Sequence, residues 1–242
     1  MSNDEPKVAL LAGASGLVGG YALDSLLDAP DFARVFAISR RPLGREHPRL
    51  ANRIVQFDKL EAQLKGTTCH VAFCCLGTTR KKAEGSEEAF REVDYDLVLS
   101  FARAARAAGA QRFVVVTSAK ADPASKYMYL RVKGEVEQAL ERVGFPSLDI
   151  LQPSVLLGWR KELRPLELLS MAAMPLVNPF LTGTRASLRA ISARTVAQAM
   201  IGAARSNRRG TYRYTWQAIQ QLAAIKPVRN VPFNPKQQSG AR

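Results

Sequence analysis

Cysteine and histidine are scarce in this chain of 242 residues, and their scarcity excludes two classes of protein. The cysteines number three, and two of them, Cys74 and Cys75, are adjacent, so they do not describe a disulfide scaffold and instead indicate a reducing compartment. The two histidines, His47 and His70, have no spacing suited to a metal ion. We therefore predict neither a disulfide framework nor a metal site.

Long apolar runs are also missing. No segment approaches the roughly 20 apolar residues that a helix needs to cross a bilayer. The polar, acidic start at Met1–Pro6 lacks the basic and apolar regions of a secretory signal. Yet 47% of the residues are apolar and 23% are charged, which is enough to build a sizeable core. Length and composition therefore predict a cytoplasmic globular protein with a single domain over residues 1–225.

Acidic residues are nearly absent from the last third of the chain. The net charge of +14 divides into 21 basic and 19 acidic residues over positions 1–157, and 14 basic and 2 acidic residues over positions 158–242. A field of one sign attracts anions, which here could be a phosphate-bearing ligand, an acidic protein partner or an anionic membrane surface. The alternative is that the charge only keeps the protein soluble. No specific nucleic-acid partner is predicted.

Two patterns alternate regularly along the first 157 residues. Short apolar runs predict buried strands at residues 7–12, 35–38, 54–57, 71–76, 113–116 and 148–151. Helical periodicity predicts helices at residues 17–27, 87–108 and 127–143. Strands that alternate with helices of this length form right-handed βαβ units, so the sequence predicts an α/β fold with a Rossmann-type, doubly wound parallel sheet.

The pattern becomes irregular after residue 158. Prolines interrupt the apolar stretch at 166–181, so we expect residues 158–190 to form a small lid or substrate segment. The remaining expected elements are a helix at 195–204, a strand at 212–216 and a helix at 217–225. Residues 226–242 are rich in proline, glutamine and basic residues and have little to bury, which predicts a disordered basic tail.

A glycine-rich turn follows the first predicted strand. Gly13, Gly16 and Gly19 recur at every third position just where the first helix begins. The first glycine permits a tight turn, the second lets backbone approach a pyrophosphate, and the third allows close packing of helix on strand. The start of the helix then offers free N–H groups to phosphate. Glycines also punctuate ordinary turns, which is the structural alternative.

The end of the second predicted strand indicates which dinucleotide would bind. An acidic residue there would bind the ribose 2′-hydroxyl of NAD, but this strand ends in Ser39-Arg40-Arg41. Guanidinium groups suit the 2′-phosphate of NADP, although a solvated basic loop would look the same. Asp58, which follows the third predicted strand, could accept a hydrogen bond from the adenine amine or could only cap its loop.

Ser118, Tyr129 and Lys133 form a candidate catalytic set. Ser118 follows the strand predicted at 113–116, and so lies at the carboxyl edge of the sheet, where open α/β folds bind ligands. Tyr129 and Lys133 share one face of the predicted helix, whereas Tyr127 is about 240° around the helix from Lys133. A neighbouring ammonium lowers the pKa of a phenol toward the range of acid–base catalysis. Taken alone, Tyr-x-x-x-Lys also describes an ordinary surface helix.

Three segments together resemble an atypical short-chain dehydrogenase/reductase, namely Gly13–Gly19, Phe73–Thr79 and Tyr129–Glu137. They are most similar to the branch of Tat-interactive, oxidoreductase-like proteins, over residues 6–160 and more loosely to about residue 225. The resemblance implies Ser118, Tyr129 and Lys133 as the catalytic set. It also implies contacts to NADPH from the glycine turn, the second strand end and the loops after the fourth and sixth strands: Gly13, Ser15, Gly16, Leu17, Val18, Arg40, Arg41, Leu76, Gly77, Thr78, Pro153 and Val155.

The chain departs from this family in two respects. Val93-Asp94 stand where many relatives place an asparagine for proton relay. The C-terminal part is small, which argues against a bulky nucleotide-sugar substrate. We predict an NADPH-dependent oxidoreductase that reduces a small carbonyl substrate. Members of the branch are often described as regulators that bind the nucleotide, so the alternative is an NADP(H)-binding regulatory protein that acts through a protein partner.

Overall fold

The structure, a computed structural model, describes residues 6–78, 86–158 and 189–225. The predicted lid at 158–190 lies outside the described residues except at its two ends, and the predicted tail at 226–242 lies wholly outside them. Within the described part of the chain, no helix is both long and apolar enough to span a bilayer. The same residues contain no group of three or more potential side-chain ligands that could hold a metal ion.

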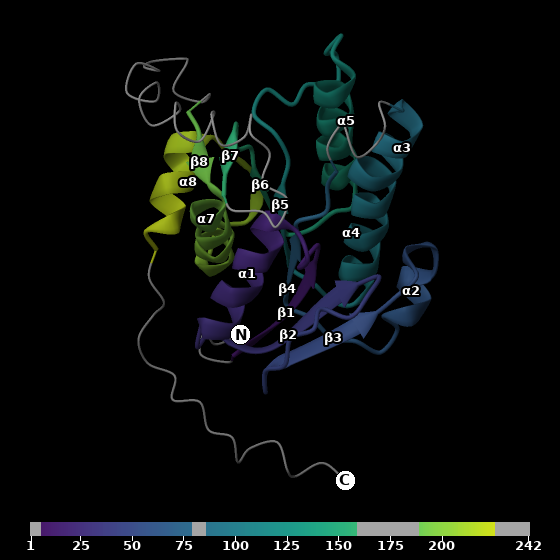
Figure 1. Ribbon diagram of the computed structural model, residues 1–242, viewed down its shortest axis with the longest axis vertical. Coiled ribbons are helices and arrows are strands. Elements are labelled where there is room, and N and C mark those ends of the chain that lie inside the picture. Colours follow the sequence, from purple (N-terminus) through teal and green to yellow (C-terminus); the bar gives the residue numbers. More distant parts are fainter. Residues whose placement is uncertain (1–5, 79–85, 159–188, 226–242) are drawn as a thin grey trace.

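Seven parallel strands form the central sheet, which confirms the predicted doubly wound α/β fold (Figure 1). In spatial order they are β3 (Leu50–Ile54), β2 (Phe32–Ser39), β1 (Lys7–Ala12), β4 (Val71–Cys74), β5 (Arg112–Val116), β6 (Ser147–Leu151) and β9 (Gly210–Tyr214). The strand order reverses between β1 and β4, which are hydrogen-bonded neighbours. Ligands of open α/β sheets bind at such a reversal, outside the carboxyl ends of the strands.

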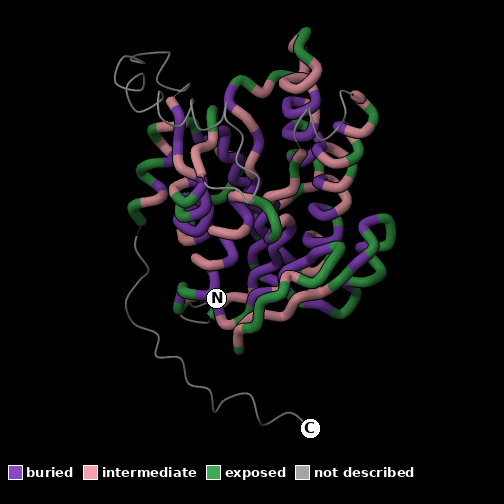
Figure 2. Tube along the Cα trace, in the orientation of Figure 1, coloured by how far each residue is buried: buried purple, intermediate pink, exposed green. Residues whose placement is uncertain are grey.

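Helices cover both faces of the sheet (Figure 1). One layer contains α1 (Leu17–Asp28), α7 (Ala193–Arg205) and α8 (Trp216–Ala223), and the other contains α2 (Leu60–Gln63), α4 (Leu97–Ala107) and α5 (Met128–Arg142). The strands are apolar on both sides because side chains alternate between two cores: Leu11 packs under the first layer and Leu10 under the second. Figure 2 shows this burial along the strands and the inner faces of the helices.

The third strand lies earlier in the chain than predicted. The apolar run at 54–57 indicated a strand, but β3 is Leu50–Ile54, and Phe57–Lys59 form a short 3-10 helix. β3 is the edge strand of the sheet and pairs only with β2, so it tolerates polar residues such as Asn52. Phe57 is buried instead beneath α4, where its carbonyl accepts a hydrogen bond from Ser100 Oγ at 3.1 Å. Burial therefore explains the apolar run without a strand.

The single helix predicted at 87–108 is also wrong in detail. The segment contains α3 (Glu87–Arg91), a π-helical turn at Glu92–Asp96 and then α4. A π turn holds one extra residue, and such turns occur frequently at functional sites. The short pair β7 (Leu156–Leu157) and β8 (Ile191–Ser192), which forms a separate parallel ladder, was not predicted because two-residue strands leave no periodicity to detect.

A buried network of charged and hydrogen-bonded groups joins β5 and β6 to the end of α7 and to the residues that follow it. The Arg112 guanidinium donates hydrogen bonds to Asp149 Oδ2 at 2.8 Å and to the carbonyls of Ala203, Ser206 and Arg208. Asp149 is fully buried, and burial raises its pKa despite the opposing effect of Arg112. The network lies at the amino-terminal end of β5, away from the carboxyl edge where ligands bind.

Replacing Arg112 with methionine is expected to lower the melting temperature by roughly 10 °C. Breaking a buried ion pair costs about 3–5 kcal/mol, and in a chain of this size each kcal/mol lowers the melting temperature by about 2–4 °C. Arg106→Met is the matched control, since Arg106 makes a single exposed hydrogen bond, to the Gly144 carbonyl at 3.2 Å. Thermal unfolding of both variants checks this. Equal melting temperatures for the two variants would contradict a stabilising role for the Arg112 network.

Candidate functional site

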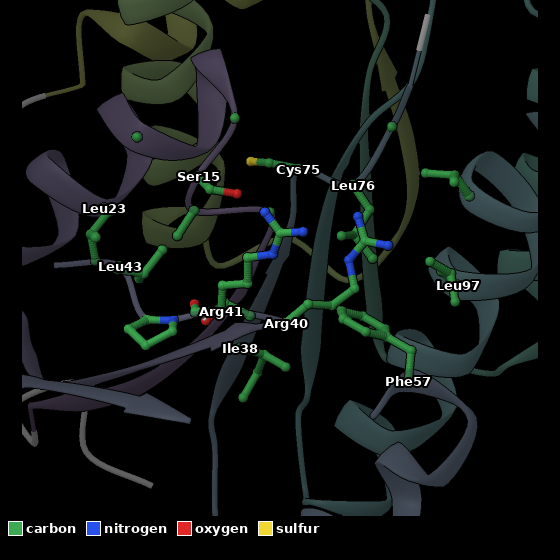
Figure 3. Close-up of a pocket in the computed structure, with 18 of the residues that line it drawn as sticks. Ser15, Leu23, Ile38, Arg40, Arg41, Leu43, Phe57, Cys75, Leu76 and Leu97 are labelled. Carbon is green, nitrogen blue, oxygen red and sulfur yellow. Dashed lines mark hydrogen bonds between the residues drawn. The ribbon is translucent and has the colours of Figure 1, made fainter. Parts of the chain in front are cut away.

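A cavity of about 1000 Å³ opens at the carboxyl ends of β1, β2 and β4, beside the reversal of strand order (Figure 3). Its wall combines the glycine-rich turn, the end of β2, the 3-10 helix and the loop after β4. The residues that line it are Gly13, Ala14, Ser15, Gly16, Gly20, Leu23, Ile38, Ser39, Arg40, Arg41, Pro42, Leu43, Arg45, Phe57, Cys75, Leu76, Gly77, Val93 and Leu97.

The glycine-rich turn requires its glycines. Gly13 has a φ of +86°, and a Cβ at this position would lie 2.5 Å from the carbonyl oxygen of Cys75, which follows β4. A Cβ at Gly19 would lie 2.0 Å from the carbonyl oxygen of Gly13 itself. The first and third glycines therefore have the two predicted structural roles, a tight turn and a close approach of α1 to the sheet.

The turn leads into an uncapped helix end. Gly16 is the N-cap of α1 and provides no side-chain hydrogen bond, and the first turn of the helix contains no acidic residue. The first N–H groups of a helix have no partner within it, so those of Leu17, Val18 and Gly19 remain available to an anion. The residues present therefore fit a phosphate group, because no side chain caps the helix end.

Arg40 and Arg41 are exposed and project from the end of β2 into the cavity (Figure 3). The Arg41 guanidinium extends toward Ser15, and that of Arg40 toward Leu76 and Phe57. A third arginine, Arg45, lines the same wall and pairs with Asp24 of α1. Among the described residues that line the cavity there is no carboxylate. This side of the cavity is therefore cationic.

Asp58 is placed differently from the arginines. It is exposed in the 3-10 helix and does not line the cavity, whereas its neighbour Phe57 does. Leu76 and Gly77, after β4, line the opposite wall. The structure thus brings these two predicted residues to the cavity and leaves Asp58 beside it.

Lys133 and Tyr129 lie on one face of α5, beyond Gly77. Lys133 is buried, and its ammonium would lie 3.8 Å from a Cβ at Gly77, which places it directly behind the cavity wall. The Tyr129 ring packs against Phe90 with the centroids 5.5 Å apart, and its phenol is close enough to act electrostatically on Lys133. Tyr127 is 63% exposed and precedes the helix as its N-cap residue, so it is the poorer partner, as predicted.

Ser118 follows β5, next to the end of β6. Its hydroxyl donates to the Ala119 carbonyl at 3.3 Å, and the Ala119 N–H donates to the Pro153 carbonyl at 2.9 Å. Pro153 is buried here, whereas Val155 is 43% exposed. No described hydrogen bond joins Ser118 to Tyr129.

Asp94 is the residue whose role the sequence did not reveal. It is fully buried in the π turn, and its Oδ1 lies 2.7 Å from Lys133 Nζ. Its Oδ2 accepts a hydrogen bond from the Thr78 N–H at 2.7 Å. The departure at Val93-Asp94 marked the position, but only the π turn shows that the carboxylate faces Lys133.

A family model and a relative of known name together show the family of this chain. The HIM1 family model matches residues 52–176, about half of the chain. Protein HTATIP2 of Rattus norvegicus is 40% identical over 168 residues, which span 68% of this chain and 69% of that protein. The chain belongs to the HIM1 family. The mitochondrial protein fmp52 of Aspergillus fumigatus is a further relative, 37% identical over 164 residues that span 65% of the chain and 70% of that protein.

Solved structures resemble this HIM1-family chain in fold. A short-chain dehydrogenase from Burkholderia cenocepacia J2315, solved with NADP, has a TM-score of 0.62 at 18% identity and covers 92% of this chain and 95% of its own. MoeE5, solved with UDP-glucose and NAD, has a TM-score of 0.62 at 17% identity, and the match covers 86% of this chain and 75% of MoeE5. The chain therefore shares the fold of these two structures, and its 40% identity to HTATIP2 confirms the predicted resemblance to the Tat-interactive branch.

A second carboxylate of the HIM1-family protein anchors the strands beneath the site. Glu137, one helical turn beyond Lys133, accepts hydrogen bonds from Thr117 Oγ1 at 2.6 Å, from Gln152 Nε2 at 3.0 Å and from Arg213 Nε at 2.9 Å. These donors come from β9 and from the residues that follow β5 and β6. Glu137 therefore fixes α5 against the strand ends that carry Ser118.

The cysteines of the HIM1-family protein pack as apolar residues. All three are free thiols, and Cys69 and Cys74 are buried. Burial raises the pKa of both thiols to about 12, which keeps them protonated at neutral pH. Burial also raises the pKa of Cys75, which lines the cavity and has its Sγ 3.6 Å from Met200 Sδ. Thiols of this kind are poor nucleophiles.

Proposed function

We propose that this protein is an NADPH-dependent oxidoreductase that reduces a small carbonyl compound. The cavity is the observation that carries the proposal. On one side the glycine-rich turn, whose side chains here are only those of Ala14 and Ser15, leads to an uncapped helix end. On the other side Arg40 and Arg41 project inward, and no carboxylate is among the described residues that line the cavity. A dinucleotide pyrophosphate suits the first side, and a ribose 2′-phosphate suits the second.

The proposed reduction would use Ser118, Tyr129 and Lys133, which lie outside the residues that line the cavity, with Lys133 behind its wall at Gly77. Bound NADPH would supply a hydride. The Tyr129 phenol would donate a proton to the carbonyl oxygen, and the Ser118 hydroxyl would donate a hydrogen bond to the same oxygen. The Lys133 ammonium would donate hydrogen bonds to the ribose hydroxyls. Ser118 follows β5 at the carboxyl edge of the sheet. Tyr129 and Lys133 lie on α5, with the Lys133 ammonium behind Gly77.

Replacing Arg40 and Arg41 together with serine is expected to weaken NADPH binding by about 10- to 100-fold, because hydrogen bonds to a charged group contribute about 1.5–3 kcal/mol. NADH binding should change little, since NADH has no 2′-phosphate. Arg34→Ser is the control: Arg34 is also an exposed arginine of β2, but it stacks on Phe36 at 5.3 Å and does not line the cavity. Calorimetric titration of both nucleotides checks this, and an equal loss for NADH would contradict the assignment of the arginines to the phosphate.

A screen of aldehydes and ketones for NADPH oxidation tests the reaction itself. Turnover of any of them supports an enzyme. Binding of NADPH without turnover would favour the alternative, a nucleotide-binding regulator that acts through an acidic partner. The alternative draws on the basic excess of residues 158–242, although within the described part Arg205 pairs with Asp31 and Arg213 with Glu137 and Glu141. A membrane surface as partner is tested by sedimentation with anionic and neutral vesicles.

A cytoplasmic location belongs to the same proposal. The names of the fmp52 relatives assign them to mitochondria. Fractionation of cells that express the full chain distinguishes the two locations.

A further inference from the structure

Asp94 occupies an unusual place in the fold. It lies in the π turn between α3 and α4, and the turn directs it toward α5 and the loop after β4. Its carboxylate is fully buried, which is costly for a charge unless the charge is paired. Both of its oxygens are engaged, Oδ1 by Lys133 Nζ and Oδ2 by the Thr78 N–H, each at 2.7 Å.

The two partners of Asp94 are both donors, and this explains why the residue is an aspartate. An ammonium group and a backbone N–H each need an acceptor, and a carboxylate offers one oxygen to each. An asparagine has one oxygen and one NH₂ group, so it would satisfy one donor and face the other with a second donor. Asparagine at position 94 therefore cannot make the contacts seen in this chain.

We propose that Asp94 is a positioning residue that holds Lys133 and the Thr78 backbone as one unit beside the nucleotide cavity. The inference rests on the proposed function, because Lys133 and Thr78 are among the residues assigned to the nucleotide. In this arrangement a direct ion pair joins the π turn to α5. Lys133 then keeps its charge and its place whether or not nucleotide is bound.

The electrostatics around Lys133 agree with this geometry. Burial lowers the pKa of Lys133, but Asp94 opposes it, and the pKa lies above its usual value. The other groups that face Lys133 are Tyr129 on its own helix and Cys74 on β4. Burial raises the pKa of the Cys74 thiol to about 12, and Asp94 acts on Lys133 more strongly than either Tyr129 or Cys74 does. Asp94 therefore supplies the negative charge that keeps the buried ammonium protonated.

The test is Asp94→Asn, with nucleotide affinity measured across pH. Without the carboxylate, burial alone acts on Lys133, so its pKa falls and the ammonium is lost as the pH rises. The ratio of the Kd of the variant to that of the wild type, for NADPH from about pH 6 to about pH 9, should rise by up to about tenfold per pH unit above the lowered pKa. Using the ratio cancels the titration of the nucleotide phosphate.

Asp96→Asn is the matched control, since Asp96 lies in the same π turn but is exposed. Its ratio should stay flat. The double variant Asp94→Asn/Lys133→Met should also give a flat ratio, which identifies Lys133 as the titrating group, and should melt above Asp94→Asn because no unpaired charge remains. Comparing the melting temperatures of the single and the double variant tests the inference even if Asp94→Asn is too unstable for binding measurements.

The outcomes separate the inference from the function. If neither the wild type nor Asp96→Asn binds NADPH, the proposed function is wrong. If both bind and the ratio for Asp94→Asn is flat across pH, Asp94 does not control the charge of Lys133 and the inference is overturned. A double variant that melts no higher than Asp94→Asn would overturn it as well.

Discussion

Replacing Gly19 with alanine is expected to abolish measurable NADPH binding, whereas Gly20→Ala, which adds one methyl group at another position that lines the cavity, should retain most of it. A Cβ at Gly19 would lie 2.0 Å from the Gly13 carbonyl oxygen and 2.6 Å from its carbonyl carbon. Both are backbone atoms, which cannot rotate away as a flexible side chain can. Either α1 or the turn must therefore shift, and each forms part of the wall where a pyrophosphate would lie.

The neighbouring glycine makes the comparison sharp. A Cβ at Gly20 would be 3.7 Å from the Ala14 carbonyl oxygen, an ordinary contact. Alanine is favoured over glycine inside a helix by about 0.5–1 kcal/mol, so Gly20→Ala should raise the melting temperature slightly while Gly19→Ala lowers it. Calorimetry with NADPH and thermal unfolding measure both effects. Similar nucleotide affinities for the two variants would contradict the role given to the turn.

The glycine turn could be found from the sequence because everything it requires is local. A buried parallel strand is a short apolar run, and the turn needs glycine at fixed positions for steric reasons that operate over a few residues. The same holds for the pair Tyr129 and Lys133, since helical spacing alone places them on one face. Together with the right-handed crossover rule, these local signals predict a doubly wound parallel sheet, whereas the order of its strands comes from the structure.

The parts that the sequence did not reveal depend on contacts between distant segments. The strand predicted at 54–57 was wrongly placed, because Phe57 is buried beneath α4 and does not belong to a strand. The π turn could not be predicted from the spacing of apolar residues, because its one extra residue changes that spacing at a single point within an otherwise helical segment. The ion pair of Asp94 with Lys133 joins two helices that are separate in the chain. Only tertiary structure shows that this aspartate and this lysine meet.

Tyr129 and Tyr127 offer the most direct test of the proposed reaction. Tyr129 lies on the same helical face as Lys133, and its ring packs against Phe90. Tyr127 is exposed and lies over Lys126, with its ring 5.5 Å from that ammonium. Phenylalanine keeps the ring contact at either position and removes only the hydroxyl. The pair of variants therefore isolates the chemical contribution of each phenol.

Tyr129→Phe is expected to lower turnover of a carbonyl substrate by about 100- to 10,000-fold, the usual contribution of a positioned general acid. NADPH affinity and the melting temperature should be nearly unchanged, because the aromatic contact with Phe90 is kept. Tyr127→Phe should retain full turnover. Rates of NADPH oxidation under saturating nucleotide measure both variants, and retained turnover in Tyr129→Phe would falsify the assignment. A loss in Tyr127→Phe alone would assign the general acid to Tyr127, the residue that precedes α5, instead of Tyr129.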